Sequence, residues 1–145
     1  MKVTAKSLKN FEVEITSGKH NFISDEPIGV GDDAGPDPYA VLLSSLGACK
    51  VMTVLMYARK KDWPLEEVAV NLDIQKIHVE DCKDCESNPN AKVDVINVSI
   101  EFIGNLTETQ ILRLEEISSH CPVHRTLTGE IKIYTKTVKK GEDAF

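Results

Sequence analysis

Hydrophobic and polar residues alternate near the amino terminus. Phe11, Val13 and Ile15 are apolar, the residues between them are polar, and Ser17-Gly18-Lys19 then favours a turn. This pattern predicts an antiparallel hairpin. The next segment, 25–38, is dense in Asp, Gly and Pro and has no sustained period, so it predicts a long loop. Loops of this length are usually functional or bound to a partner.

A helix of unusual composition is predicted over residues 38–58. Asp37 and Pro38 favour a helix start, and apolar residues then fall on every face, with Lys50 as the one charge. A bilayer span is disfavoured because a charge at mid-helix costs about 2.5–3.5 kcal/mol. A helix of about 30 Å enclosed on all sides is hard to cover with the rest of one short chain. We expect a second copy of the chain to cover it.

The second half of the chain predicts two strands, a helix and a closing strand. Alternating residues in 68–79 and 93–103 predict a long bent hairpin, and a slip in the alternation near Ile77 predicts a β-bulge. Thr107 and Gln110 form a capping-box pattern that opens a helix ending near His120. Alternation at 131–135 predicts the closing strand. The element order indicates one α+β domain over residues 1–145, with a mainly antiparallel sheet.

Composition narrows the class of protein. The 145 residues are 41% hydrophobic and 28% charged, as in an ordinary globular domain, and the net charge of −6 disfavours a general nucleic-acid binder. The amino terminus does not resemble a secretory signal, so we expect a cytoplasmic protein with no membrane partner. Four cysteines in such a protein favour reactive thiols or metal ligands over structural disulfides.

Two of the cysteines are candidates for nucleophilic chemistry. Cys49 lies on one stripe of the apolar helix, where a cysteine on its own is usually a small core residue. Cys121 directly precedes Pro122. If Pro122 begins a short helix, Cys121 occupies its cap, where backbone amides favour the thiolate. His124 and Arg125 follow within one turn and add positive charge. The alternative is a thiol that only caps the helix.

The other two cysteines form a C-x-x-C pair. Cys82 and Cys85 have the spacing of metal or redox sites, and His78 supplies a third potential donor. Four neighbouring carboxylates raise thiol pKa values, which argues against a fast nucleophile. A solvated hairpin loop is the favoured interpretation, ahead of a zinc site or a labile disulfide.

Two segments resemble one known family. The stretch Pro-x-x-x-Leu-Leu-x-x-Leu-x-x-Cys ending at Cys49, followed by Cys-Pro-Val at 121–123, is similar to the OsmC/Ohr superfamily of osmotically inducible and organic hydroperoxide resistance proteins. The resemblance covers most of the chain. It implies an α+β protomer that interlocks with a second copy in a homodimer.

The resemblance also implies a mechanism without a bound cofactor. Cys49, as thiolate, would attack a hydroperoxide and become a sulfenic acid, and Cys121 would condense with it to a disulfide. An external dithiol of lipoyl type would restore both thiols. The alkyl group of an organic peroxide would lie against apolar side chains of the helix, for which the candidates are Tyr39, Leu42, Leu46, Met52 and Met56.

The sequence departs from well-characterised members at two positions. Those members carry a glutamate after the helix-opening proline and an arginine from the amino-terminal segment, whereas here Tyr39 follows Pro38 and no arginine precedes Arg59. The cation for Cys49 must then come from another residue; the candidates are Lys19, His20, Lys50, His124 and Arg125. Two other functions stay open: a non-catalytic dimer that binds a small apolar or thiol-reactive ligand, and a scaffold stabilised by zinc.

Overall fold

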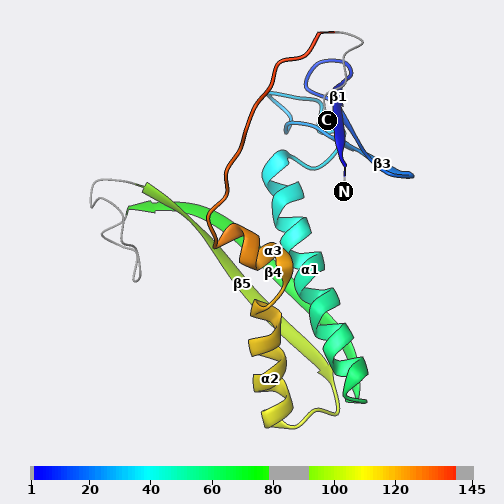
Figure 1. Ribbon diagram of the computed structural model, residues 1–145, viewed down its shortest axis with the longest axis vertical. Helices are drawn as coiled ribbons and strands as arrows, with labels where there is room; N and C mark the ends of the chain where they lie inside the picture. The colour runs from blue at the N-terminus through cyan, green and yellow to red at the C-terminus, as the bar shows by residue number, and fades with distance from the viewer. Residues whose placement is uncertain (1, 79–91, 140–145) are drawn as a thin grey trace.

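The computed structural model describes residues 2–78 and 92–139 (Figure 1). Its elements in chain order are β1 (Thr4–Ser7), β2 (Val13–Ser17), β3 (His20–Ser24), α1 (Pro38–Lys60), β4 (Leu65–His78), β5 (Lys92–Gly104), α2 (Glu108–Ser119) and α3 (Pro122–Leu127). Helices and antiparallel strands are both present, which confirms the mixed α and β class expected from the sequence. The predicted hairpin and loop at 11–38 and the predicted helices are also present.

The strands form two separate antiparallel sheets. In the small sheet, β2 lies between β1 and β3, and Gly18 takes a positive φ of 60° in the turn that joins β2 to β3. In the large hairpin, β4 pairs with β5 from Leu65 opposite Gly104 to His78 opposite Lys92. The pairing register is irregular between Leu65 and Glu67 and continuous at Ile77, so the bulge predicted near Ile77 is wrong in position.

The closing strand predicted at 131–135 is not formed. Residues 130–139 run as an extended segment, outside both sheets of the described chain, from α3 back toward the amino-terminal sheet (Figure 1). Ile131, Ile133 and Tyr134 are 52%, 86% and 85% exposed. Alternation gave the right local conformation, but a strand also needs a neighbouring edge to pair with.

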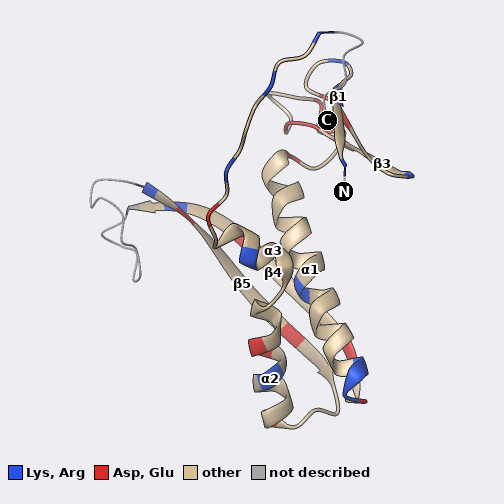
Figure 2. Ribbon diagram, viewed as in Figure 1, with Lys and Arg blue, Asp and Glu red and all other residues tan. Residues whose placement is uncertain are grey.

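The helix α1 begins as the sequence predicts. The Asp37 carboxylate accepts a hydrogen bond from the Ala40 amide at 2.9 Å, and Pro38 occupies the first turn, where its missing N–H costs nothing. Figure 2 shows little charge along the helix before its last turn. Within one protomer α1 is covered on one side only: Leu46, Val54 and Ala58 are buried. As the sequence analysis anticipates, the single chain does not cover α1 on all sides; its cover by a second copy stays a prediction.

By length and composition, α1 is the one described helix that could cross a bilayer. The middle of α1 nevertheless contacts another helix of the chain. The Lys50 ammonium is buried and donates a hydrogen bond to the Ser118 carbonyl of α2 at 3.2 Å. A buried lysine held by the end of a second helix is a feature of a protein interior, so α1 packs against protein at this point.

The hydrophobic core is small and lies where α1, α2 and the β4–β5 hairpin meet. Val54, Ala58 and Leu114 are at most 2% exposed, and half-buried side chains surround them: Tyr57, Trp63, Leu65, Val68, Phe102 and Leu106. The chain exposes 11275 Å², whereas a compact monomer of 16.1 kDa exposes about 7,400 Å². The single chain is thus less compact than a typical monomer, and large apolar side chains such as Met52 and Met56 are exposed on it.

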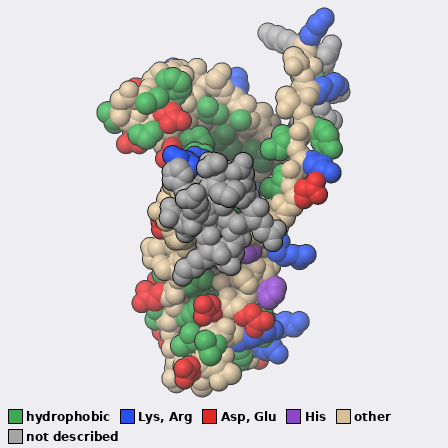
Figure 3. All heavy atoms as spheres, turned by 90° about the vertical axis from the view of Figure 1, so that its left-hand side faces the viewer, with side chains coloured by type: hydrophobic (Ala, Val, Ile, Leu, Met, Phe, Trp, Pro, Cys, Tyr) green, Lys and Arg blue, Asp and Glu red, His purple; other side chains and the backbone are tan. Residues whose placement is uncertain are grey.

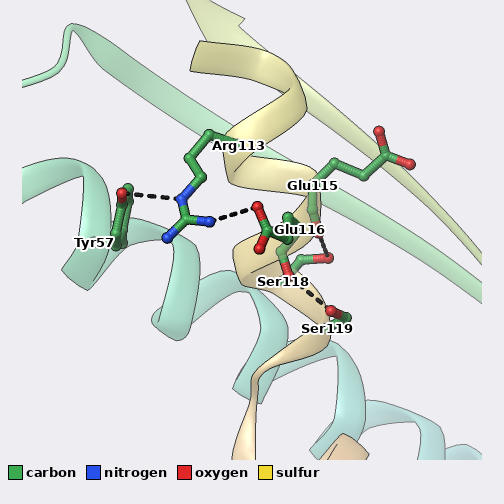
Figure 4. A network of polar contacts seen from close by, with 6 residues as sticks. All are labelled: Tyr57, Arg113, Glu115, Glu116, Ser118 and Ser119. Atoms are coloured by element: carbon green, nitrogen blue, oxygen red, sulfur yellow. Dashed lines mark hydrogen bonds and ion pairs between the residues drawn. The ribbon is translucent and has the colours of Figure 1, made fainter. Parts of the chain in front are cut away.

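Polar contacts fix α2 against α1 beside this core. Thr107 and Gln110 form the predicted capping box at the start of α2. Arg113 then donates a hydrogen bond to the Tyr57 hydroxyl of α1 at 3.2 Å and pairs with Glu116 (Figure 4). The Arg113 guanidinium also lies over the Tyr57 ring, 5.6 Å from its centre. These contacts set which face of α2 packs on α1.

The loop between β3 and α1 is organised by one carboxylate. Asp25 lies in this polar loop but is only 2% exposed. Its oxygens accept hydrogen bonds from the amides of Glu26, Asp32 and Ala34 at 2.8–3.1 Å. These bonds hold the pKa of Asp25 below its usual range, the Ala34 amide being the largest cause. The Asp25 carboxylate thus holds the loop in its folded conformation through these hydrogen bonds.

The core leads to a prediction with a matched control. Leu114→Ala removes a side chain that is fully buried between α1 and α2, and we expect the free energy of unfolding to fall by about 2–5 kcal/mol. Leu112→Ala on the same helix, at a side chain that is 60% exposed, is the control and should cost under about 1 kcal/mol. Urea denaturation measures both. Equal losses would show that this cluster is not the core.

Candidate functional site

Cys49 is presented by the middle of α1. The side chain is half-buried and its thiol is free. One turn later Thr53 donates its hydroxyl to the Cys49 carbonyl at 2.7 Å, which keeps the Thr53 side chain turned to the backbone. Cys49 therefore occupies a partly open position on an otherwise rigid helix.

Cys121 sits at the other predicted position, the N-cap of α3. Pro122 occupies the first turn of this helix, and the Cys121 sulfur accepts a hydrogen bond from the His124 amide at 3.2 Å. The side chain is fully buried and its thiol is also free. The conditional prediction that Pro122 opens a short helix is confirmed.

The fold brings the two cysteines together. The Val123 amide in the first turn of α3 donates to the Cys49 sulfur at 3.5 Å. The Cys121 thiol also lies close enough to Cys49 for Cys49 to raise its pKa. Two thiols from distant parts of the chain thus share one site, where backbone amides of α3 point at both sulfur atoms.

The two thiols differ in their surroundings. Burial is the largest cause that raises the pKa of Cys121, and the hydrogen bond and charge of Cys49 raise it further. The His124 amide and the Lys50 charge act in the opposite direction without cancelling the rise. Cys121 therefore keeps its proton at neutral pH, whereas Cys49 is the more accessible of the two.

The candidate cations are divided between two places. Lys50 and His124 lie beside the cysteines: Lys50 is 4% exposed, and its charge acts on both Cys121 and His124. Burial first, and then Lys50, lower the pKa of His124, so its imidazole is neutral at pH 7. Arg125 is exposed on α3. Lys19 and His20 are exposed in the β2–β3 turn, which projects away from α1 and α3 within the protomer (Figure 1).

The proposed apolar pocket is not enclosed by one protomer. Tyr39, Met52 and Met56 are 54%, 60% and 65% exposed. Leu42 is half-buried, and Leu46 is buried beside Lys50. Tyr39 borders one cavity of the described chain and Leu46 borders another, so these two do not face a shared space there. The prediction placed them on α1 correctly, but a pocket needs a second wall opposite that helix.

The zinc hypothesis falls largely outside the described residues. Cys82 and Cys85 are not among them, and His78 is the last residue of β4. Elsewhere in the described chain, the carboxylates of Glu12, Asp25 and Asp32 come within 4.8 Å of one another. Asp25 is already committed to loop amides, and Lys9 pairs with Glu12 at 3.0 Å, so this acidic group is part of the loop.

A family model described as OsmC-like protein matches residues 31–136. The chain belongs to the OsmC family. The match spans the β3–α1 loop, both cysteines, α2 and α3, and it confirms the resemblance seen in the sequence. No curated protein sequence matches the chain.

Solved structures of OsmC-like proteins share the fold. The OsmC-like protein of Mycoplasma pneumoniae is 24% identical, with 88% of this chain and 86% of that chain covered and a TM-score of 0.69. An organic hydroperoxide resistance protein OsmC of Legionella pneumophila is 18% identical, with 88% of each chain covered and a TM-score of 0.61. OhrB of Bacillus subtilis, an organic hydroperoxide resistance protein, is 14% identical over 88% and 90%, with a TM-score of 0.59. At these identities the likeness establishes the architecture.

The raised pKa of Cys121 predicts a change in stability at alkaline pH. Above about pH 8.5, the ordinary thiol value, the unfolded chain loses a proton that the folded chain keeps. The free energy of unfolding therefore falls as pH rises, by up to about 1.4 kcal/mol per pH unit.

Cys121→Ser should remove this part of the decline, because serine does not titrate in the range. Urea denaturation between pH 7 and 10 in a reducing buffer measures it, with Cys49→Ser as the control that retains most of the decline. Identical slopes for wild type and Cys121→Ser would contradict the assignment.

Proposed function

We propose that this OsmC-family protein is a thiol-dependent peroxidase-like enzyme that reduces organic hydroperoxides with Cys49 and Cys121. The observation that carries the proposal is their convergence: α3, which Cys121 caps, donates its Val123 amide to the Cys49 sulfur at 3.5 Å. The family match and the names of its structural relatives, which include organic hydroperoxide resistance proteins, support the same reaction class.

The surroundings of the thiols favour Cys49 as the attacking group. It is the more accessible cysteine, and the Val123 amide donates a hydrogen bond to its sulfur at 3.5 Å. Its thiolate attacks the distal oxygen of the hydroperoxide and the O–O bond breaks. The alkoxide leaves as the alcohol after taking up a proton. Cys49 is oxidised to the sulfenic acid.

Cys121 is then the resolving thiol. Deprotonated as it reacts, its sulfur attacks the Cys49 sulfur, the S–O bond breaks, and hydroxide leaves as water with the proton from Cys121. A Cys49–Cys121 disulfide results. An external dithiol returns both residues to thiols by two exchange steps and is itself oxidised to a disulfide. The reaction requires no bound cofactor, and free thiols of this kind suit the cytoplasm.

We further propose that the enzyme works as a homodimer. The single chain exposes about half as much surface again as a compact monomer of its mass, and Met52 and Met56 are exposed on the helix that carries Cys49. Figure 3 shows further hydrophobic side chains over the amino-terminal sheet and along the extended segment after α3. A second copy packed on the face of α1 that carries Met52 and Met56 would supply the missing wall of the peroxide pocket.

The peroxidase proposal predicts a defined cysteine chemistry. In a Cys82→Ser, Cys85→Ser background, one equivalent of cumene hydroperoxide should produce a Cys49–Cys121 disulfide, detected by peptide mass mapping. Cys49→Ser should lose peroxide turnover. Cys121→Ser should react once and leave a Cys49 sulfenic acid that dimedone traps. The background protein itself is the control and should keep full turnover. A Cys49→Ser protein that turns over at the wild-type rate would sink the proposal.

The dimer proposal predicts twice the chain mass of 16.1 kDa in sedimentation velocity. Met56→Glu places a charge on the exposed apolar face of α1 and should weaken the dimer by about tenfold or more, since burying an unpaired charge is costly. Arg59→Glu, exposed in the last turn of the same helix, is the control and should remain dimeric. A wild-type protein that sediments as a monomer at micromolar concentration would rule the dimer out.

A further inference from the structure

Lys50 is buried without a countercharge from any described carboxylate. Its side chain is 4% exposed, and its one recorded hydrogen bond is to a neutral acceptor, the Ser118 carbonyl at 3.2 Å. The four ion pairs in the described part of the chain all involve other cations. Buried ammonium groups are normally paired, because an unpaired one loses several kcal/mol of hydration. The carbonyl end of α2 balances part of this charge.

Lys50 also lines a cavity, and its charge acts on His124, which lines the same cavity. This cavity lies between α1, β5 and α3 and has a volume of about 380 Å³. Its apolar wall consists of Leu46, Ile96, Val98 and Leu127. The volume falls in the range of small-molecule sites, which combine apolar walls with a few polar groups. We call this space the Lys50 cavity.

The charges around the Lys50 cavity favour an anion. Asp94 also borders it, but its carboxylate is paired with Lys76 at 2.8 Å. A second groove that Lys50 reaches, between α2 and β5, is bordered by Glu116, which pairs with Arg113, and by Glu115, which makes no ion pair with a described residue. An anion is repelled at that groove and attracted to the Lys50 cavity, where the buried cation is the dominant charge.

We propose that the Lys50 cavity binds a small aliphatic monocarboxylate, with its carboxylate on the Lys50 ammonium and its chain against Leu46, Ile96 and Leu127. The ammonium has donors to spare beyond the bond to Ser118. The neutral His124 ring adds one N–H donor at the same cavity. Neither cysteine lines the cavity, although Lys50 and His124 also lie beside them, so the site adjoins the proposed peroxidase centre without including its sulfur atoms.

The test uses the reduced full-length protein and two probes of equal chain length, octanoate and 1-octanol. Titration followed by methyl NMR should show saturable octanoate binding with shifts at Leu46, Ile96 and Leu127. The alcohol should bind at least about tenfold more weakly, since a charge-assisted hydrogen bond is worth about 1.5–3 kcal/mol. Equal affinities, or no saturable octanoate binding at millimolar concentration, would overturn the proposal.

Two kinds of variant test the Lys50 charge and the space of the cavity separately. Lys50→Met should weaken octanoate binding by about tenfold or more, and Lys50→Arg should restore most of it. Lys60→Met, exposed at the end of α1, is the control. If Lys50→Met does not fold, Ile96→Trp fills the cavity while leaving Lys50 in place and should abolish octanoate binding. Unchanged affinity in a folded Lys50→Met or Ile96→Trp protein would refute the site.

Cys49→Ser distinguishes this site from the peroxidase proposal. The variant should bind octanoate as the wild type does, because Cys49 does not border the cavity. A wild-type protein that binds octanoate but shows no peroxide-dependent disulfide would support the site while removing the peroxidase function.

Discussion

The packing of α1 against α2 is the constraint on which the remaining structure depends. At one end of this contact Leu114 packs on Val54 and Ala58. At the other end Lys50 donates a hydrogen bond to the last turn of α2. Because α2 is held at both ends, the chain that leaves it must pass close to the middle of α1. Cys121 follows within three residues of Ser118, so its approach to Cys49 is a consequence of helix packing.

The local features of the fold were predictable, since each is encoded in a few neighbouring residues. Asp37 with Pro38, Thr107 with Gln110, and Cys121 with Pro122 each begin a helix where the sequence indicates. Features that depend on distant residues were not. The segment 131–135 alternates like a strand, yet it pairs with no strand among residues 2–78 and 92–139. Asp25 stands in a polar loop, yet loop amides enclose its carboxylate.

The candidate site was also predictable only in part: the two cysteines were, and the accompanying cation was not. Family resemblance singled out Cys49 and Cys121, and the structure shows their proximity. Which cation accompanies them could not be read from the sequence, because Lys19, Lys50 and Arg125 are equally plausible until the fold is known. The signal for Lys50 was its isolation as the single charge in an apolar helix. That isolation implies a specific acceptor, which proves to be the end of α2.

The sulfur of Cys121, at the start of α3, takes part in two interactions. The same atom that accepts the His124 amide also lies against Cys49. A sulfur that turns to bond with another atom leaves that amide without its acceptor, and a helix of six residues has few other contacts to hold its first turn. In the proposed disulfide, the order of the first turn of α3 would therefore depend on the oxidation state of this one sulfur.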